Sequence, residues 1–415
     1  MTGVLREYRS FGRPVRLMVL NQFTINLGFY MLMPYLAMHL SGELALAGWL
    51  VGLVLGVRNF AQQGMFLIGG TLADRFGCKP LIVAGCALRT AGFALLGLVD
   101  TVPALIIASA ATGFAGALFN PAVRAYVARD AGPRRVEAFA LFNVFYQAGI
   151  LLGPVVGLGL TALDFRLTCL VAAGVFAVLT VLQIRSLPHQ EAPPRQAVRV
   201  TRVWRSILAN RPFLLFSLAM VGSYVLSFQV YLALPLEARR VMGPGPAGTA
   251  VVTALFAVSA GLAVAGQLRV TALFKRKLGP GGSLVAGLAM MSAAFLPPAL
   301  TSGSGAAPTV AALLTSAILL ALGTAVVFPF EMDTIVRLSG DHLVATHYGL
   351  YNTVVGIGIL LGNLFTGTAL DLARAAGTPA LPWLALTVIG IACAAYVHRL
   401  TRSEVERSAA AVPSP

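Results

Sequence analysis

The chain has 415 residues, of which 58% are hydrophobic and 11% are charged, and its formal net charge at pH 7 is +15. Soluble domains carry about 25% charged residues, so a chain this poor in charge could not cover the surface of a soluble globular protein. The composition therefore argues against a soluble enzyme and indicates an integral membrane protein.

Taken in chain order, the apolar residues fall into twelve blocks, each long enough to cross a hydrocarbon core of about 30 Å as a helix. Backbone groups inside lipid must hydrogen-bond within the protein, so we predict helices and not strands. The expected fold class is an all-α integral membrane protein with twelve transmembrane helices. The predicted spans are residues 17–39, 47–70, 80–99, 103–127, 138–160, 168–184, 212–236, 249–273, 283–300, 309–336, 348–370 and 382–400.

Four arginines, Arg6, Arg9, Arg13 and Arg16, precede the first block, as in a signal peptide. The block is too long for the apolar region of a signal peptide and lacks a clear cleavage site of small residues. We therefore interpret it as a retained first span.

The basic residues are unevenly distributed along the chain. If residue 1 is cytoplasmic, most of the 30 Lys and Arg residues fall in inside segments or at the span ends beside them. The outside segments hold only Arg166, Arg239, Arg240 and Arg374. The positive-inside rule therefore predicts a multi-pass protein of the cell membrane with both termini in the cytoplasm. The net positive charge then reflects membrane topology and attraction to anionic lipid headgroups. We therefore expect no nucleic-acid partner.

Residues 185–211 form the longest charged interruption and separate six predicted spans from six others. The predicted organisation is an N-terminal six-helix half (1–184), a cytoplasmic linker (185–211), a C-terminal six-helix half (212–400) and a cytoplasmic tail (401–415).

The two halves resemble each other in sequence. Residues 141–154 (LFNVFYQAGILLGP) match residues 350–363 (LYNTVVGIGILLGN), and the GILLG segment is identical. Two parallel homologous halves joined by a cytoplasmic loop are typical of transporters, whose halves rock around a site near the bilayer midplane. Other matches in the same order align Gly77 with Gly279, Pro121 with Pro329, and Gly132 with Gly340.

The loop between the second and third predicted spans, GGTLADRFGCK, gathers charges and turn-forming residues. Gly69 and Gly70 let the end of the second helix approach a neighbour closely, and Gly77 permits a tight reversal. Asp74 suits a position at a helix end, where its carboxylate would interact with a facing helix dipole or with Arg75.

The segment GTLADRFGCK resembles the G-x-L-A-D-R-x-G-R-K signature of the major facilitator superfamily, with Cys78 in place of the usual basic residue. The resemblance implies two pseudo-symmetric six-helix halves and alternating access. It also implies that Asp74 and Arg75 help to close the cytoplasmic side when the protein faces outward. The residues assigned to this gating motif are Gly70, Asp74, Arg75, Gly77 and Lys79.

Residues 149–157 (GILLGPVVG) place small residues at every fourth position, which creates a face for close helix packing. The proline frees a backbone carbonyl and permits a bend. The pattern is also similar to the G-x-x-x-G-P-x-x-G signature of the superfamily's drug:proton antiporters, which favours export. Antiporters of this group often carry an arginine early in the fourth helix, and residues 106–119 contain no basic residue. The residues of the antiporter-like motif are Gly149, Gly153, Pro154 and Gly157.

Charged residues inside membrane spans are costly and are first interpreted as functional. Arg58 lies on a polar face of the second span, and Glu331 and Asp333 lie toward the cytoplasmic end of the tenth. These three are the candidates for proton coupling. Three interpretations of Glu331 stay open: titration during transport, a structural ion pair with a basic residue such as Arg58, or exposure to water. Asp333 could end its helix in water, and we expect Arg89 to snorkel or to form a structural pair.

By the same resemblance, the first, fourth, seventh and tenth helices line a central cavity, and the fifth adds residues to it. Their uncharged polar and aromatic side chains suit weakly polar or amphipathic molecules rather than highly charged ones. The substrate-cavity candidates are Asn21, Gln22, Asn26, Tyr146, Gln147, Tyr224 and Gln229.

The sequence contains no nucleotide-binding, metal-binding or catalytic constellation. The 4 cysteines show no paired spacing, and the 5 histidines lie at span ends or in loops. We therefore expect no enzyme activity, no metal and no cofactor, with energy taken from an ion gradient, that of protons.

The functional prediction is a secondary active transporter that exports small, mostly apolar compounds by proton-coupled alternating access. We expect a monomer whose partners are the lipid bilayer, a small-molecule substrate and protons. Two alternatives remain: an importer or facilitator of a small metabolite, and a sensor or scaffold with a transporter fold that moves nothing.

Overall fold

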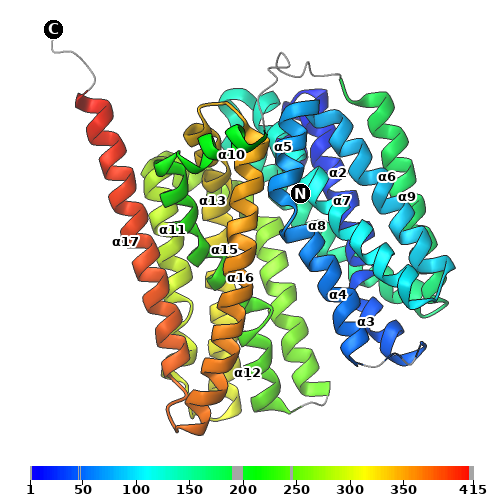
Figure 1. Cartoon of the computed structure of the whole chain (residues 1–415). Helices are drawn as coiled ribbons and strands as arrows, with labels where there is room; N and C mark the ends of the chain where they lie inside the picture. The colour runs from blue at the N-terminus through cyan, green and yellow to red at the C-terminus, as the bar shows by residue number, and fades with distance from the viewer. Residues whose placement is uncertain (1, 45, 47, 189–199, 244–245, 411–415) are drawn as a thin grey trace. The chain divides into compact units, whose positions relative to one another are not determined.

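The computed structural model describes residues 2–44, 46, 48–188, 200–243 and 246–410. Within these ranges all regular structure is helical, as the composition predicts (Figure 1). The predicted linker lies partly outside the described residues, at 189–199, and so does the end of the predicted tail, at 411–415.

The chain forms two compact units. Unit 1 is Met1–Asn210 with Ile335–Gly356, and unit 2 is Arg211–Thr334 with Ile357–Pro415. The first boundary falls at the end of the predicted linker, but unit 1 also takes in a segment of the second half of the chain. The predicted division into two halves stays a prediction.

In unit 1, α6 packs against α7 and α9, α2 packs against α8, and α4 packs against α7. The end of α15 and the start of α16 also belong to this unit. The elements of the first part of the chain are α1 (Thr2–Ser10), α2 (Arg13–Tyr30), α3 (Met33–Gly42), α4 (Gly48–Gln63), α5 (Phe66–Phe76), α6 (Cys78–Leu98), α7 (Val102–Ala131), η1 (Gly132–Arg134), α8 (Arg135–Thr161), α9 (Phe165–Ser186) and α10 (Val200–Leu208).

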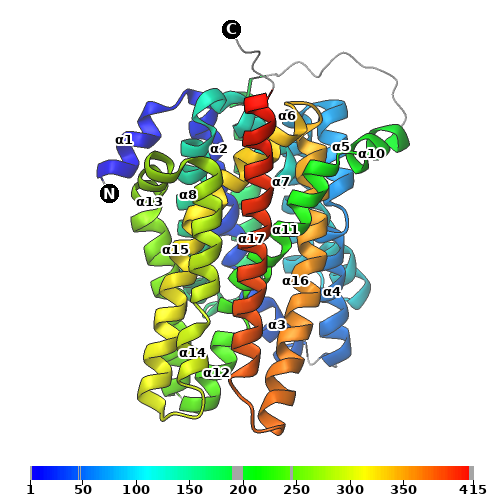
Figure 2. The same ribbon diagram turned by 90° about the vertical axis from the view of Figure 1, so that its left-hand side faces the viewer.

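In unit 2, α13 and α17 lie side by side (Figure 2), α12 packs against α13, and α11 packs against α17. The remaining elements are α11 (Arg211–Ser227), η2 (Phe228–Val230), α12 (Ala233–Met242), α13 (Pro246–Ala293), α14 (Leu296–Leu300), α15 (Ala306–Ser339), α16 (Val344–Ala375) and α17 (Leu381–Ala410).

Among the described residues, 8 helical stretches are long and apolar enough to cross a membrane. Two of these stretches, Val102–Thr161 and Ala250–Leu300, each contain two predicted blocks, and the others match one block each. The first two predicted blocks fall on the helix pairs α2–α3 and α4–α5, each of which is interrupted by a short break. Every predicted block is therefore largely helical, and the number of twelve crossings stays a prediction.

Two pairs of glycines that the internal repeat aligns have a positive φ, which is an unusual backbone conformation. Gly77 has a φ of 93° and Gly279 has a φ of 65°; Gly132 and Gly340 have φ of 51° and 61°. A side chain at such a φ is disfavoured, so glycine is the residue that allows the chain to turn between helices there. The repeat in sequence thus corresponds to a repeat in local conformation.

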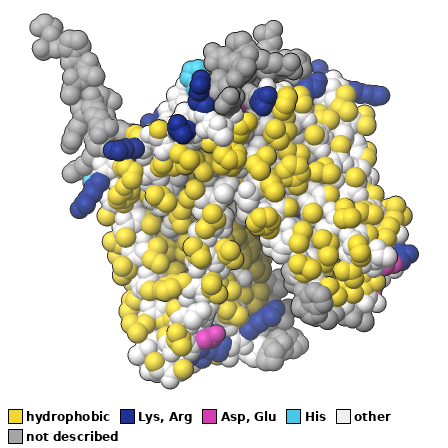
Figure 3. Space-filling model, in the orientation of Figure 1, with side chains coloured by type: hydrophobic (Ala, Val, Ile, Leu, Met, Phe, Trp, Pro, Cys, Tyr) yellow, Lys and Arg dark blue, Asp and Glu magenta, His cyan; other side chains and the backbone are white. Residues whose placement is uncertain are grey.

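Large apolar side chains are exposed on the flanks of the helices (Figure 3). Examples are Val155 at 67% and Leu158 at 62% exposure on α8, and Leu364 at 67% on α16. In the same view the Lys and Arg side chains lie toward the ends of the helices (Figure 3). An apolar surface of this extent marks an interaction site, here the lipid that surrounds the spans.

Candidate functional site

The predicted gating motif lies at the end of α5, where Asp74 meets the first turn of α16. Asp74 Oδ1 accepts a hydrogen bond from the Ala345 backbone N–H at 3.2 Å. Asp74 Oδ2 accepts one from the Thr346 backbone N–H at 2.7 Å and one from the Thr346 hydroxyl at 2.6 Å. The first N–H groups of a helix lack partners within the helix, and its dipole favours a negative charge there. The partner of Asp74 is therefore the facing helix end and not Arg75.

Two glycines bring α5 and α16 into backbone contact. A Cβ at Gly70 would lie 2.1 Å from the Ala345 carbonyl oxygen, and a Cβ at Gly349 would lie 2.4 Å from that of Phe66. Asp74 follows Gly70 by four residues, so both project from the same face of α5. The close approach of the two backbones is what allows a side chain as short as aspartate to reach the end of α16.

The position of Asp74 changes its acidity. Burial raises the pKa of Asp74 from an ordinary value of 3.8 to about 6, although the hydrogen bonds from Thr346 and Ala345 act in the opposite direction. Desolvation disfavours the ionised carboxylate, and hydrogen-bond donors stabilise it. The carboxyl group at this contact therefore takes up a proton under only mildly acidic conditions.

The other residues of the motif make different contacts. Gly77 ends α5 and precedes α6 with a φ of 93°, which is the predicted reversal. The Lys79 ammonium donates a hydrogen bond to the Leu187 carbonyl at 2.6 Å, which places a cation at the C-terminal end of α9. Arg75 is exposed, and its guanidinium lies 5.6 Å from the centroid of the Phe76 ring.

Other polar contacts lie in unit 1, on α5, α7, α8, α10 and the region around the start of α16. The sequence alone did not predict them. The Trp204 indole N–H, on α10, donates to the Thr71 hydroxyl of α5 at 3.0 Å. Arg124 donates to Asn352 Oδ1 at 2.6 Å, and Arg135 forms an ion pair with Asp341 at 2.6 Å.

The sequence does carry signals for some of these residues. Asn352 is the repeat equivalent of Asn143. In residues 200–208, the apolar Val200, Val203, Trp204 and Ile207 recur at intervals of three and four, which is the pattern of an amphipathic helix.

The glycines of the antiporter-like motif pack α8 against α2 and α3. A Cβ at Gly149 would lie 2.6 Å from the Phe23 carbonyl oxygen, and one at Gly157 would lie 2.0 Å from that of Met31. At Gly153 the nearest atom, the Tyr30 Cβ, would be 2.7 Å away. The carbonyl of Pro154 accepts a hydrogen bond from the Tyr35 hydroxyl at 2.6 Å. The small-residue face therefore acts as a close-packing surface.

The expectation that Arg89 snorkels to the membrane surface is wrong. Arg89 is 3% exposed, and the centroids of Phe29, Phe119 and Phe176 lie 4.9, 4.9 and 5.4 Å from its guanidinium carbon. Arg58 of α4 is half-buried and lies 5.1 Å from the centroid of the same Phe29 ring. The two arginines that the sequence singled out inside spans thus share one aromatic neighbour.

The cavity candidates of the first half are buried in unit 1. Asn21 and Gln22 are each 2% exposed and Asn26 is 6% exposed, on α2. Asn26 donates to the Gln22 carbonyl of its own helix at 2.7 Å. Tyr146 and Gln147 of α8 are half-buried, and the Tyr146 hydroxyl is hydrogen-bonded to Tyr30.

The candidates of the second half lie in unit 2. Gln229, in η2, donates to the Val225 carbonyl at 2.7 Å and to Asn363 Oδ1 at 3.4 Å, and Tyr224 of α11 is half-buried. Glu331 of α15 is 2% exposed, which argues against simple exposure to water. Asp333 is half-buried and does not end its helix, since α15 continues to Ser339. The suggested pairing of Glu331 with Arg58 stays a prediction.

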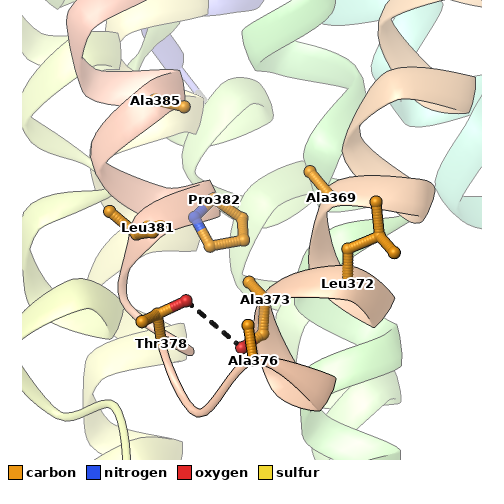
Figure 4. A pocket seen from close by; sticks show the side chains of 8 residues that line it. All are labelled: Ala369, Leu372, Ala373, Ala376, Thr378, Leu381, Pro382 and Ala385. Atoms are coloured by element: carbon orange, nitrogen blue, oxygen red, sulfur yellow. Dashed lines mark hydrogen bonds between the residues drawn. The ribbon is translucent and has the colours of Figure 1, made fainter.

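A small hollow of unit 2 lies between the end of α16 and the start of α17 (Figure 4). Its lining is apolar apart from Thr378, whose hydroxyl donates to the Ala373 carbonyl at 3.4 Å. It contains none of the predicted site residues. The lining residues are Ala369, Leu372, Ala373, Ala376, Thr378, Leu381, Pro382 and Ala385.

Comparison with solved structures shows the fold. The chain superimposes on the human organic anion transporter MFSD10 with a TM-score of 0.71 at 16% identity, covering 93% of this chain and 99% of the other. It superimposes on the Escherichia coli fucose:proton symporter FucP with a TM-score of 0.71 at 14% identity, covering 94% and 98% of the two chains.

Sequence relatives agree with this fold. An uncharacterized MFS-type transporter of Mycobacterium tuberculosis strain H37Rv is 55% identical over 402 residues, which is 96% of each chain. The multidrug resistance protein MdtH of Escherichia coli strain K12 is 30% identical over 378 residues, which is 90% of each chain. The family model of the Major Facilitator Superfamily matches residues 18–363. The chain belongs to the Major Facilitator Superfamily of membrane transporters.

Proposed function

We propose that this transporter exports small, mostly apolar compounds from the cytoplasm in exchange for protons. The observation that carries the proposal is the 30% identity to the multidrug resistance protein MdtH over 90% of both chains. The close-packed glycine face of α8, which follows the antiporter-like pattern, supports the same direction of transport. The uncharged polar side chains buried on α2 support a substrate of low polarity.

In the proposed cycle, the contact between Asp74 and the first turn of α16 closes the cytoplasmic side of the transporter. Three hydrogen bonds hold this contact together, and all of them join the same carboxylate to Ala345 and Thr346. Binding of cytoplasmic substrate requires that the contact opens, and release on the other side follows when it forms again. Asp74 and Thr346 thus act in gating and take no part in a chemical reaction.

Proton coupling is assigned to Glu331, with Asp333 and Arg58 as further candidates. Glu331 is 2% exposed, and an acidic residue inside a membrane span is typical of the proton relays of transporters. One proton that crosses a potential of 100 mV supplies about 2.3 kcal/mol, enough for roughly fifty-fold accumulation of a substrate.

The test uses the purified protein in liposomes with an imposed pH gradient. Lumenal pH is followed while lipophilic dyes and antibiotics are added one at a time. We expect substrate-dependent proton flux that Glu331→Gln abolishes. The matched control is Glu43→Gln, because the Glu43 side chain is 65% exposed and lies at a helix end.

The outcomes separate the alternatives. Flux in both wild type and Glu331→Gln would support antiport and remove Glu331 from coupling. Absence of proton flux combined with saturable counterflow of one metabolite would replace export by facilitated import. A protein that moves none of these compounds would fit the sensor or scaffold alternative.

A further inference from the structure

The membrane-spanning part of the first half has an unbalanced charge. None of its six predicted spans contains Asp or Glu, whereas Arg58, Arg89 and Arg124 all lie within them. Arg124 donates to the neutral Asn352. Within the described residues of unit 1, no carboxylate forms an ion pair with Arg58 or Arg89.

Arg58 and Arg89 approach each other around Phe29. Their guanidinium carbons lie 5.1 and 4.9 Å from the Phe29 ring centroid, and the two charges are close enough to repel each other. The Arg89 guanidinium also packs closely against α7. A Cβ added at Gly116 of α7 would lie 2.9 Å from Arg89 Nη2. Helices α2, α4, α6 and α7 thus hold two cations together in one place.

The hydrogen bonds of the two guanidiniums are incomplete. Arg89 Nη2 donates to the Thr112 carbonyl at 3.2 Å, and Arg58 Nη2 donates to Asn59 Oδ1. The Nε atoms of Arg58 and Arg89 are both buried, and neither has a hydrogen-bond partner. An unsatisfied donor on a buried charge is costly, so donors remain for an additional acceptor.

Aromatic rings compensate these charges only in part. A desolvated cation–π contact stabilises a cation, but by less than the cost of removing that ion from water, even after relaxation. Two adjacent cations add mutual repulsion to that cost. In unit 1 this pair of cations has no acid beside it, so the positive potential there favours an anion as the missing partner.

Resting on the proposed function, we propose that Arg58 and Arg89 form an anion site in unit 1 and that the preferred substrates are amphipathic monoanions. Half-buried Arg58 contacts the anionic group, and fully buried Arg89 adds positive potential behind it. The Tyr30 hydroxyl lies within electrostatic reach of both guanidiniums and is hydrogen-bonded to Tyr146. Phe29 and the polar residues of α2 accommodate the uncharged body of the ligand.

The test measures binding without any ion gradient, so its failure is distinguishable from a failure of proton-coupled export. Octanoate and octanamide share an alkyl chain and differ in charge near neutral pH. Their affinities for the full chain in phosphatidylcholine nanodiscs are compared by calorimetry, with empty nanodiscs as the blank. We expect octanoate to bind at least tenfold more tightly than octanamide.

The variants assign this preference to the site. Arg58→Gln is expected to bring octanoate down to the affinity of octanamide, and Arg58→Lys is expected to retain part of the preference. Arg202→Gln, at an exposed arginine of α10, is the control and is expected to bind like wild type. If Arg58→Gln does not fold, the comparison of the two ligands on wild type decides the question.

Three results would overturn the proposal. Equal binding of octanoate and octanamide would mean that no anion site exists, as expected if Arg58 is already paired with Glu331. A preference that survives in Arg58→Gln would place the anion elsewhere. Loss of octanoate binding in phosphatidylglycerol nanodiscs would assign the site to a lipid headgroup and not to a substrate.

Discussion

A single methyl group at Gly70 should open the contact between α5 and α16. The Cβ of Gly70→Ala would lie 2.1 Å from the Ala345 carbonyl oxygen and 2.9 Å from the Thr346 Cα, and both atoms belong to backbone. Carbon–oxygen contacts are normally about 3.3 Å or longer. The first turn of α16 must therefore retreat by about 1 Å, because no flexible side chain can give way.

The magnitude follows from the bonds of Asp74. A retreat of that size would lengthen the two bonds to Thr346, now 2.7 and 2.6 Å, beyond the limit of a hydrogen bond. Hydrogen bonds to charged groups contribute about 1.5–3 kcal/mol each, and water replaces part of the loss. We expect the contact to weaken by about 2–4 kcal/mol, which is roughly thirty- to thousand-fold in its equilibrium constant.

The assay is a distance measurement between spin labels on Arg75 and His342, which are both exposed and both in unit 1. The four native cysteines are first replaced. Wild type should give a narrow short distance, and Gly70→Ala should give a longer one. Gly56→Ala is the matched control, since a Cβ there meets no atom within 4 Å. A short distance that persists in Gly70→Ala would refute the steric argument.

Three further predictions concern the same unit. Because burial raises the pKa of Asp74 to about 6 from 3.8, the closed contact binds a proton more tightly than the open one. The contact should therefore strengthen as pH falls from about 6 to about 4 and weaken as pH rises through that range, by up to about 3 kcal/mol. Spin-label distances that do not change with pH in wild type would contradict this. An equal pH dependence of the distance in Asp74→Asn would contradict it as well. Gly157→Ala should lower the stability of the protein in detergent by about 1–3 kcal/mol, because its Cβ would lie 2.0 Å from the Met31 carbonyl oxygen. Gly159→Ala, with no atom within 4 Å, should be neutral or stabilising in the same thermal melt, and equal effects of the two would argue against the packing face. Trp204→Phe should weaken the packing of α10 against α5 by about 0.5–1.5 kcal/mol, because the hydrogen bond to Thr71 is lost. The measurement is hydrogen exchange, in which the amides of residues 200–208 should exchange faster. Unchanged exchange would mean that this hydrogen bond does not hold α10 in place.

The sequence by itself determined the class of the protein and much of its local geometry. Apolar blocks of membrane length require helices, because no other local structure satisfies the backbone in lipid. A tight reversal was predicted at Gly77, which the internal repeat aligns with Gly279, and both have a positive φ that only glycine adopts without strain. The GTLADRFGCK and GILLGPVVG segments pointed to the superfamily because their spacing is specific.

Tertiary structure decided which residues meet. The carboxylate of Asp74 had two possible partners in sequence, and the backbone contact at Gly70 selects the end of α16, from a segment 271 residues away. Arg89 was expected to snorkel to the surface or to form a structural pair, and three rings from α2, α7 and α9 enclose it. Such contacts depend on how helices pack in space, and hydrophobic periodicity specifies only which face is apolar. The role of a buried charged residue therefore depends on neighbours that the linear sequence does not identify.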